Sequence, residues 1–190
     1  MVRLYIFQTG QTAWETQDRI EPPTGVPLTE EGALAVQDAA KELADHPISA
    51  VYACTTGEAE RQTAEQLAKT LGVKLHVRES LHDLDYGLWR GLTADELKRR
   101  QPKAYRQWIK APTSVRPPEG ETPDEAQQRL REALKKILKR HRRGSAALVL
   151  RPLAVGLLRC MMENQGLGAL WQHVDTSFRW SSYEVDQESL

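Results

Sequence analysis

Four side chains in this sequence are candidates for a nucleophile and its activating base. Thr9 and Cys54 each follow a short apolar run and are candidate nucleophiles. His82 and Asp83 are adjacent, and either could accept a proton as a general base. No sequence feature shows which base would activate which nucleophile. An enzyme that uses Thr9 or Cys54 is therefore one hypothesis.

The apolar runs alternate with helical patterns along the chain. Runs rich in β-branched or aromatic residues predict strands at 2–7, 48–53, 73–77, 146–150 and 178–185. This alternation predicts a three-layer α/β/α sandwich with a mostly parallel central sheet. Ligands bind beyond the carboxyl ends of such strands. The candidate site positions are therefore those just after Phe7, Ala53 and Leu150.

Capping patterns predict where two helices begin. Thr29 is a candidate N-cap and precedes two glutamates, whose negative charges interact favourably with the dipole of a helix that begins there. This helix is expected to run to about Asp45. Thr122 and Glu125 have the spacing of a capping box, and Pro123 lies between them at the first helical position.

Glycine and proline predict where other helices end. Gly72 follows an amphipathic segment and is expected to end it in the left-handed conformation. The stretch 92–109 has helical composition broken by Pro102, which predicts two short helices. We expect an insertion at about 92–122 within a single domain of residues 1–190.

Basic residues crowd the end of the helix that begins after Thr122, namely Lys135, Lys136, Lys139, Arg140, His141, Arg142 and Arg143. A phosphate-binding patch is one interpretation. A solvated helix end, whose cations complement the helix dipole, is the interpretation that we favour.

Composition narrows the class of protein. The 190 residues are 40% hydrophobic and 27% charged, with a formal net charge of +0. No overall field would draw the chain to nucleic acid or to an anionic membrane, so we expect neither as a partner, and any basic partner surface must be local. The apolar stretches are too short to span a membrane, and the N-terminus has no signal-peptide pattern.

The two cysteines, Cys54 and Cys160, have neither metal-type spacing nor a disulfide framework. We expect both to be small buried hydrophobic residues of a cytoplasmic protein. No metal and no cofactor is expected.

Several short motifs together resemble one known family. Residues 8–12 read Gln-Thr-Gly-Gln-Thr after the first apolar run, and residues 27–32 read Pro-Leu-Thr-Glu-Glu-Gly. Residues 87–93 read Gly-Leu-Trp-Arg-Gly-Leu-Thr, and residues 118–122 read Pro-Glu-Gly-Glu-Thr. Over most of its length the chain resembles the histidine phosphatases, which are phosphoglycerate mutase-like. The resemblance implies their fold.

The positions that carry the family's chemistry differ in this chain. Gln8 and Thr9 stand where the resemblance implies an Arg-His pair, whose histidine accepts a phosphoryl group. Ala59 replaces a phosphate-binding arginine, and Pro152 replaces the second histidine. Asp83 stands at the position of the acid, one methylene shorter than the usual glutamate. The resemblance therefore implies a scaffold without the family's catalytic residues.

The same alignment suggests a ligand site. Arg19 falls where a substrate-facing arginine is usual, and Arg151 lies beside the former second histidine. We predict that a small anionic ligand or a protein partner binds at Thr9, Gln11, Arg19, Asp83 and Arg151.

The leading hypothesis is thus a catalytically inactive protein that acts by binding. The alternatives are the enzyme with altered chemistry and a structural subunit of an oligomer. In the last case Trp108 or Trp171 would be the place to seek an interface, although core packing is the expected use of both.

Overall fold

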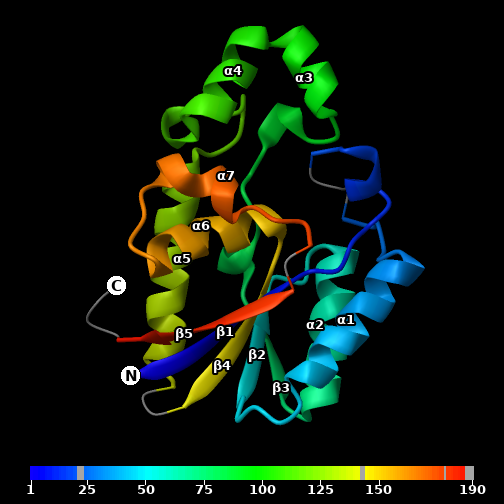
Figure 1. Cartoon of the computed structure of the whole chain (residues 1–190), viewed down its shortest axis with the longest axis vertical. Helices are drawn as coiled ribbons and strands as arrows, with labels where there is room; N and C mark the ends of the chain where they lie inside the picture. Colours follow the sequence, from blue (N-terminus) through cyan, green and yellow to red (C-terminus); the bar gives the residue numbers. More distant parts are fainter. Residues whose placement is uncertain (21–23, 142–143, 178, 187–190) are drawn as a thin grey trace.

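A computed structural model contains one five-stranded sheet with the strand order β3-β2-β4-β1-β5 (Figure 1). It describes residues 1–20, 24–141, 144–177 and 179–186. The strands are β1 Val2–Gln8, β2 Ala50–Ala53, β3 Lys74–Val77, β4 Ser145–Leu150 and β5 Trp180–Val185. The first four strands are parallel, and β5 is antiparallel to β1. The mostly parallel sheet is confirmed, while Phe178 of the last predicted strand lies outside the described residues.

Helices cover both faces of this sheet, which confirms the three layers (Figure 1). They are α1 Glu30–Glu42, α2 Glu58–Leu71, α3 Ala94–Arg100, α4 Pro102–Lys110, α5 Pro123–Leu138, α6 Pro152–Met162 and α7 Leu170–His173. Helices α1 and α2 lie on one face, and α5, α6 and α7 lie on the other. Helix α1 ends earlier than about Asp45, because its last turn tightens with Leu43 N–H donating to Ala40 C=O.

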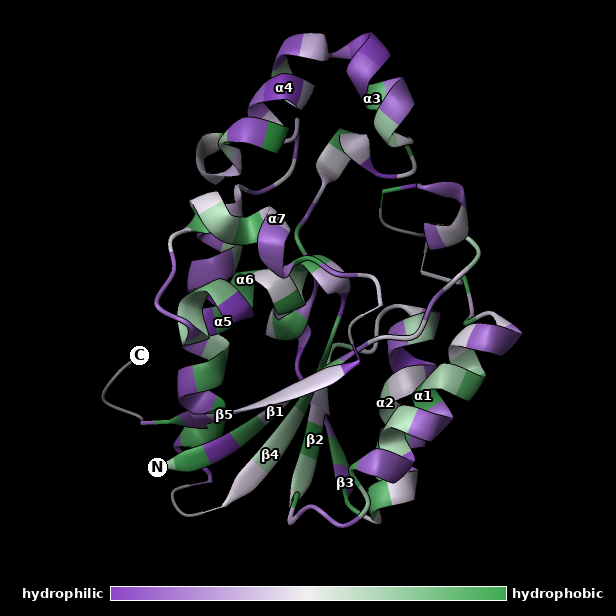
Figure 2. Cartoon of the chain, viewed as in Figure 1, coloured by the Kyte–Doolittle hydropathy of each residue, from purple (hydrophilic) through white to green (hydrophobic). Residues whose placement is uncertain are grey.

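The side chains of β1 alternate between two cores. Leu4 and Ile6 join the apolar cluster under α5 and α6, whereas Tyr5 and Phe7 join the cluster under α1 and α2. Figure 2 shows apolar stretches along the central strands β1, β2 and β4 and a mixture of hydrophilic and hydrophobic residues along α1, α2 and α5. β1 is therefore covered by helices on both sides, which is why its sequence is a nearly continuous apolar run.

The predicted caps at Thr29, Thr122 and Gly72 are confirmed. The Thr29 hydroxyl accepts a hydrogen bond from Gly32 N at 2.9 Å. Thr122 and Glu125 form the reciprocal capping box at the start of α5. Gly72 follows α2 with φ +65°, a left-handed conformation that glycine adopts without steric cost.

Helices α3 and α4 form the predicted pair of short helices on either side of Gln101. Figure 1 places them beyond the carboxyl ends of the strands. Trp108 of α4 is buried against Trp89 and Trp171, with ring centroids 5.6 and 5.2 Å away. Core packing is therefore the observed use of Trp108.

Gly87 brings two of the sequence motifs together. Its φ is +48°, and a Cβ there would lie 2.1 Å from the carbonyl oxygen of Pro118. Leu88 N donates to the same oxygen at 2.9 Å. Only glycine allows this approach, so the segment after residue 86 and the segment before α5 depend on each other.

The basic end of α5 is partly occupied by internal contacts. His141 Nε2 lies 2.9 Å from the Tyr52 hydroxyl, and its Nδ1 lies 3.3 Å from Ser49 Oγ. Arg142 and Arg143 lie outside the described residues. Within the described part of the chain, no helix has the length and apolar character needed to cross a membrane.

Candidate functional site

The ends of β1 and β4 meet at the position that the sheet topology predicts. The two strands pair in parallel, with Gln8 opposite Leu150. Thr9 N then donates to the Leu150 carbonyl oxygen at 2.9 Å, which places Thr9 beside Arg151. Helix α6 begins at Pro152 with Arg151 as its N-cap residue. Pro152 therefore has the structural role of a first helical residue.

Arg151 is the centre of a buried ionic cluster. Arg151 is 5% exposed. Its guanidinium contacts carboxylates from three segments of the chain. It forms an ion pair with Glu15, lies 3.7 Å from Glu60 and lies 4.0 Å from Asp83. Burial opposes the charge of the guanidinium, but the carboxylates of Glu60, Glu15 and Asp83 outweigh burial and raise the pKa of Arg151.

Backbone donors hold two of these carboxylates in place. Glu15 Oε2 accepts from Thr12 N at 2.8 Å and also contacts the Thr12 hydroxyl. Asp83 Oδ1 accepts from Ala154 N at 2.8 Å. Because Ala154 lies in the first turn of α6, Asp83 supplies the side-chain cap that Arg151 does not provide. The carboxylate at the family's acid position therefore stabilises a helix end.

The cluster has one positive charge and three carboxylates. With all four groups ionised, its formal charge is −2. A phosphoryl group carries the same sign, so like-charge repulsion acts against an anion here. The charge of Arg151 is paired within the protein, while its Nη1 has no hydrogen-bond partner among the described residues. That Arg151 holds an anion stays a prediction.

Among the described residues, no base forms a hydrogen bond with either candidate nucleophile. Thr9 is 7% exposed, and its Oγ1 has no hydrogen-bond partner. Cys54 is buried, and its Sγ lies 3.2 Å from the Thr56 hydroxyl. His82 is elsewhere engaged, with Nδ1 2.6 Å from the Asp83 carbonyl oxygen. Cys54 and Cys160 are both buried, as expected.

The space left beside Thr9 has two parts. A cavity of about 20 Å³ lies among Gln8, Thr9, Glu15 and Pro152. A water molecule needs about 10–15 Å³ by this measure, so the cavity has room for roughly one water. This cavity is too small for a phosphoryl group.

The second part is a cavity of about 260 Å³ between the end of β1 and α1. Its described lining includes apolar residues, two glutamines, one acid and one cation: Phe7, Val36, Ala39, Gln8, Gln11, Glu31 and Arg179. Thr9 lines both cavities.

The remaining predicted ligand residues are placed differently. Gln11 lies on the rim of the larger cavity, and its carbonyl oxygen accepts from Thr29 N at 2.9 Å. Arg19 donates to the Gly91 carbonyl oxygen at 2.9 Å and lies 3.8 Å from Glu96. Its guanidinium also stacks over Trp14 at 5.7 Å. The structure thus brings Thr9, Asp83 and Arg151 together, whereas Arg19 contacts Gly91, Glu96 and Trp14.

Other predicted positions are structural. Ala59 is buried at the start of α2, where its carbonyl oxygen accepts from the Thr63 hydroxyl. Arg61 pairs with Glu58 and Glu65 on the outer face of the same helix, so it does not replace the missing arginine. Glu15 and Glu60 were not predicted as site residues. Only their positions in the sequence could have indicated a place in the site, because Glu15 closely follows the first motif and Glu60 directly follows Ala59.

Comparisons with known proteins agree with the fold. The model of the histidine phosphatase superfamily (branch 1) matches residues 4–190. The bifunctional protein Rv2228c of Mycobacterium tuberculosis is 29% identical over 91% of this chain and 48% of its own length. The chain thus spans about half of that curated relative. A probable phosphoglycerate mutase GpmB of Escherichia fergusonii is 30% identical, over 83% of this chain and 73% of its own length.

Among solved structures, YhfR of Bacillus stearothermophilus superposes with a TM-score of 0.89. It is 28% identical, and the match covers 98% of this chain and 92% of that one. The sandwich and its strand order are therefore shared with a solved relative.

Proposed function

The chain belongs to the histidine phosphatase superfamily, and on that premise we propose that it is a catalytically inactive member that acts by binding. One observation carries the proposal. Arg151, the cation at the centre of the former phosphate site, is enclosed by the carboxylates of Glu15, Glu60 and Asp83.

The missing groups support the same conclusion. Phosphoryl transfer through histidine needs a nitrogen nucleophile and cations on the phosphoryl oxygens. Thr9, Ala59 and Pro152 supply neither. Removing a single nucleophile or phosphate-binding group costs about 100-fold or more in rate. The combined loss leaves no catalysis by the family's route.

The two alternatives have no observation in their favour. An enzyme that uses Thr9 would need a base beside the hydroxyl, and among the described residues Thr9 Oγ1 has no hydrogen-bond partner. A structural subunit whose interface is built on Trp108 conflicts with the burial of that residue among Trp89 and Trp171.

The larger cavity beside Thr9 is the proposed binding site. Its described lining holds one cation, Arg179, and one acid, Glu31, so its charges cancel. Apolar surface from Phe7 and Val36 lies next to the side chain of Gln8. A small molecule with an apolar part and a few hydrogen-bonding groups matches this lining better than a phosphate monoester.

The first experiment measures turnover. Purified protein would be assayed on a panel of phosphomonoesters, with a Thr9→Ala variant prepared in parallel to expose contaminating phosphatase. We expect no turnover that differs between the two proteins. Turnover that disappears in the variant would overturn the proposal and make Thr9 part of a different mechanism.

The second experiment locates the ligand. A library of small molecules would be screened by thermal shift with the wild type and with two variants of α1. Ala35 lines the cavity, so Ala35→Leu should abolish the shifts. Ala33 lines a separate groove between α1 and α2, so Ala33→Leu should retain them. Shifts that survive Ala35→Leu would place the ligand elsewhere.

A further inference from the structure

Positive charge is concentrated in one segment of a chain whose net charge is +0. Between Glu96 and Glu119 there is no acidic residue, and there are seven basic ones: Lys98, Arg99, Arg100, Lys103, Arg106, Lys110 and Arg116. The rest of the chain must then carry a net charge of −7 (0 − 7). The segment covers the end of α3 and all of α4, while the first turn of α3, which lies before it, carries Asp95 and Glu96.

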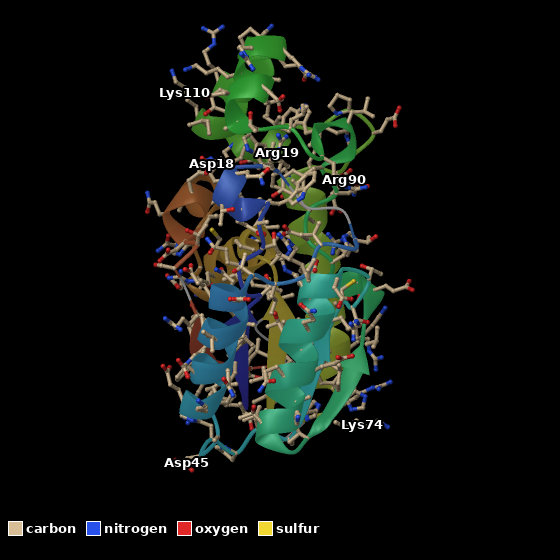
Figure 3. All side chains as sticks on the ribbon, turned by 90° about the vertical axis from the view of Figure 1, so that its right-hand side faces the viewer. Asp18, Arg19, Asp45, Lys74, Arg90 and Lys110 are labelled. Carbon is tan, nitrogen blue, oxygen red and sulfur yellow. The ribbon has the colours of Figure 1, made fainter. Side chains whose placement is uncertain are left out.

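Six of these seven cations belong to α3 and α4, and all six are exposed. None of the six makes an ion pair within 4 Å among the described side chains, whereas Arg116 pairs with Glu125. Figure 3 shows nitrogen-tipped side chains around this end of the molecule, where Lys110 is labelled. We call this surface, made of the six cations on α3 and α4, the basic hairpin.

The basic hairpin is held firmly on the fold. Trp108 anchors α4 in the aromatic cluster, and its carbonyl oxygen accepts from Trp171 Nε1 at 3.1 Å. Trp89 Nε1 donates to Gln101 Oε1 at 3.1 Å, which fixes the junction between the two helices. The cations are therefore presented in a set arrangement.

Helix stability does not explain all of these charges. Cations at the carboxyl ends of helices complement the dipole, which accounts for Lys98 to Arg100 and for Lys110. Lys103, however, lies in the first turn of α4, where a positive charge opposes the dipole. Lys103, Arg106 and Lys110 have the i, i+3 and i+7 spacing that places them on one helix face.

We propose that the basic hairpin binds the phosphate backbone of nucleic acid without reading its sequence. Neutralising phosphates with lysine and arginine supplies this kind of affinity. The basic hairpin offers no exposed aromatic ring for base stacking, because Trp108 is buried and Tyr105 is half-buried. The inference departs from the expectation drawn from net charge, since net charge averages over the whole chain.

A membrane surface fits the basic hairpin less well. A helix that lies in a bilayer interface inserts an apolar face. In α4 the aromatic side is already used by the core, and Ile109 is its one exposed large apolar residue, at 47%. The inference is independent of the proposed binding of a small molecule beside Thr9.

The test compares two charge-reversed variants of the full chain. The triple variant Lys103→Glu, Arg106→Glu, Lys110→Glu alters the basic hairpin. The triple variant Lys136→Glu, Lys139→Glu, Arg140→Glu makes the same change in charge at exposed positions near the end of α5. Binding of a fluorescein-labelled 20-base-pair DNA duplex would be followed by anisotropy from 50 to 200 mM salt, after thermal unfolding has checked that both variants fold.

We expect the wild type to bind at 50 mM salt and to lose affinity as salt rises. The α4 variant should bind about tenfold more weakly or worse, with a slope of log K against log salt reduced by about 3. The α5 variant should stay within about threefold of the wild type. Equal losses in both variants would overturn the proposal, because net charge alone would explain them. So would an absence of binding at 50 mM salt, or binding only to vesicles that contain phosphatidylserine.

Discussion

The end of the sheet around Arg151 and the aromatic cluster beneath α4 are both buried, but they are built from opposite chemistry. The first holds four ionisable groups from four segments of the chain. The second holds the rings of Trp89, Trp108 and Trp171, with few polar atoms among them.

The difference determines how each region responds to a single substitution. Removing an aromatic ring loses packing contacts and leaves a cavity, so the cost grows with the volume removed. In an ionic cluster each group depends on its partners, because a buried charge left alone is costly. The Arg151 cluster must therefore be altered as a set, whereas the aromatic cluster tolerates graded change.

The largest effect should come from the aromatic region. Trp89 is 1% exposed, and Trp89→Ala should lower the free energy of unfolding by about 3–5 kcal/mol through the cavity that it leaves. Urea unfolding followed by circular dichroism measures the loss. Leu88 is the matched control, since it is 60% exposed and Leu88→Ala should change stability by less than about 0.5 kcal/mol.

Removing the central cation should cost somewhat less. Arg151→Met leaves three carboxylates without their cation, and we expect a loss of about 3 kcal/mol, since Glu15 and Glu60 keep some exposure. The exposed Arg61 also contacts two carboxylates, so Arg61→Met is a control that should be far milder.

A double-mutant cycle sharpens this second test. If the ionic groups depend on one another, Glu15→Gln should be harmful in the wild type and should restore part of the stability of Arg151→Met. Strictly additive losses would mean that the cluster does not act as a unit.

A single hydrogen bond at the start of α5 should matter less than either region. Thr122→Ala removes the hydroxyl that accepts from Glu125 N at 3.2 Å, and about 1 kcal/mol should be lost. Thr122→Ser keeps the hydroxyl and should behave like the wild type in the same unfolding experiment.

The smallest effect should come from restoring one family residue. Thr9→His should give no measurable hydrolysis of p-nitrophenyl phosphate, because the adjoining cavity of about 20 Å³ and the surplus carboxylates exclude the substrate. Turnover well above that of Thr9→Ala would show that the Arg151 cluster does not block the site.

Local signals predicted the scaffold well. Thr29 and Thr122 begin their helices and Gly72 ends its helix as expected, because caps depend on residues within one turn. The strand after residue 144 and the proline-initiated helix that follows it were also predictable from short patterns.

The interior of the site was not predictable in the same way. Arg151 appeared available to a ligand because its three carboxylate neighbours come from distant parts of the chain. The sequence separation between Glu15 and Arg151 is 136 residues. Neither hydrophobic periodicity nor a capping pattern predicts such a contact. Only the folded structure shows that carboxylates pair with the guanidinium.

The position of β1 in the sheet has a consequence for synthesis. Strand β1 lies between β4 and β5, and six of its seven residues are buried. Its first partner begins at Ser145, 137 residues after Gln8 (145 − 8). At about 5–20 residues per second, a ribosome needs on the order of ten seconds to reach it. During that interval a strand with five apolar side chains, Val2, Leu4, Tyr5, Ile6 and Phe7, has no partner strand. A chaperone that shields extended apolar segments could bind it then.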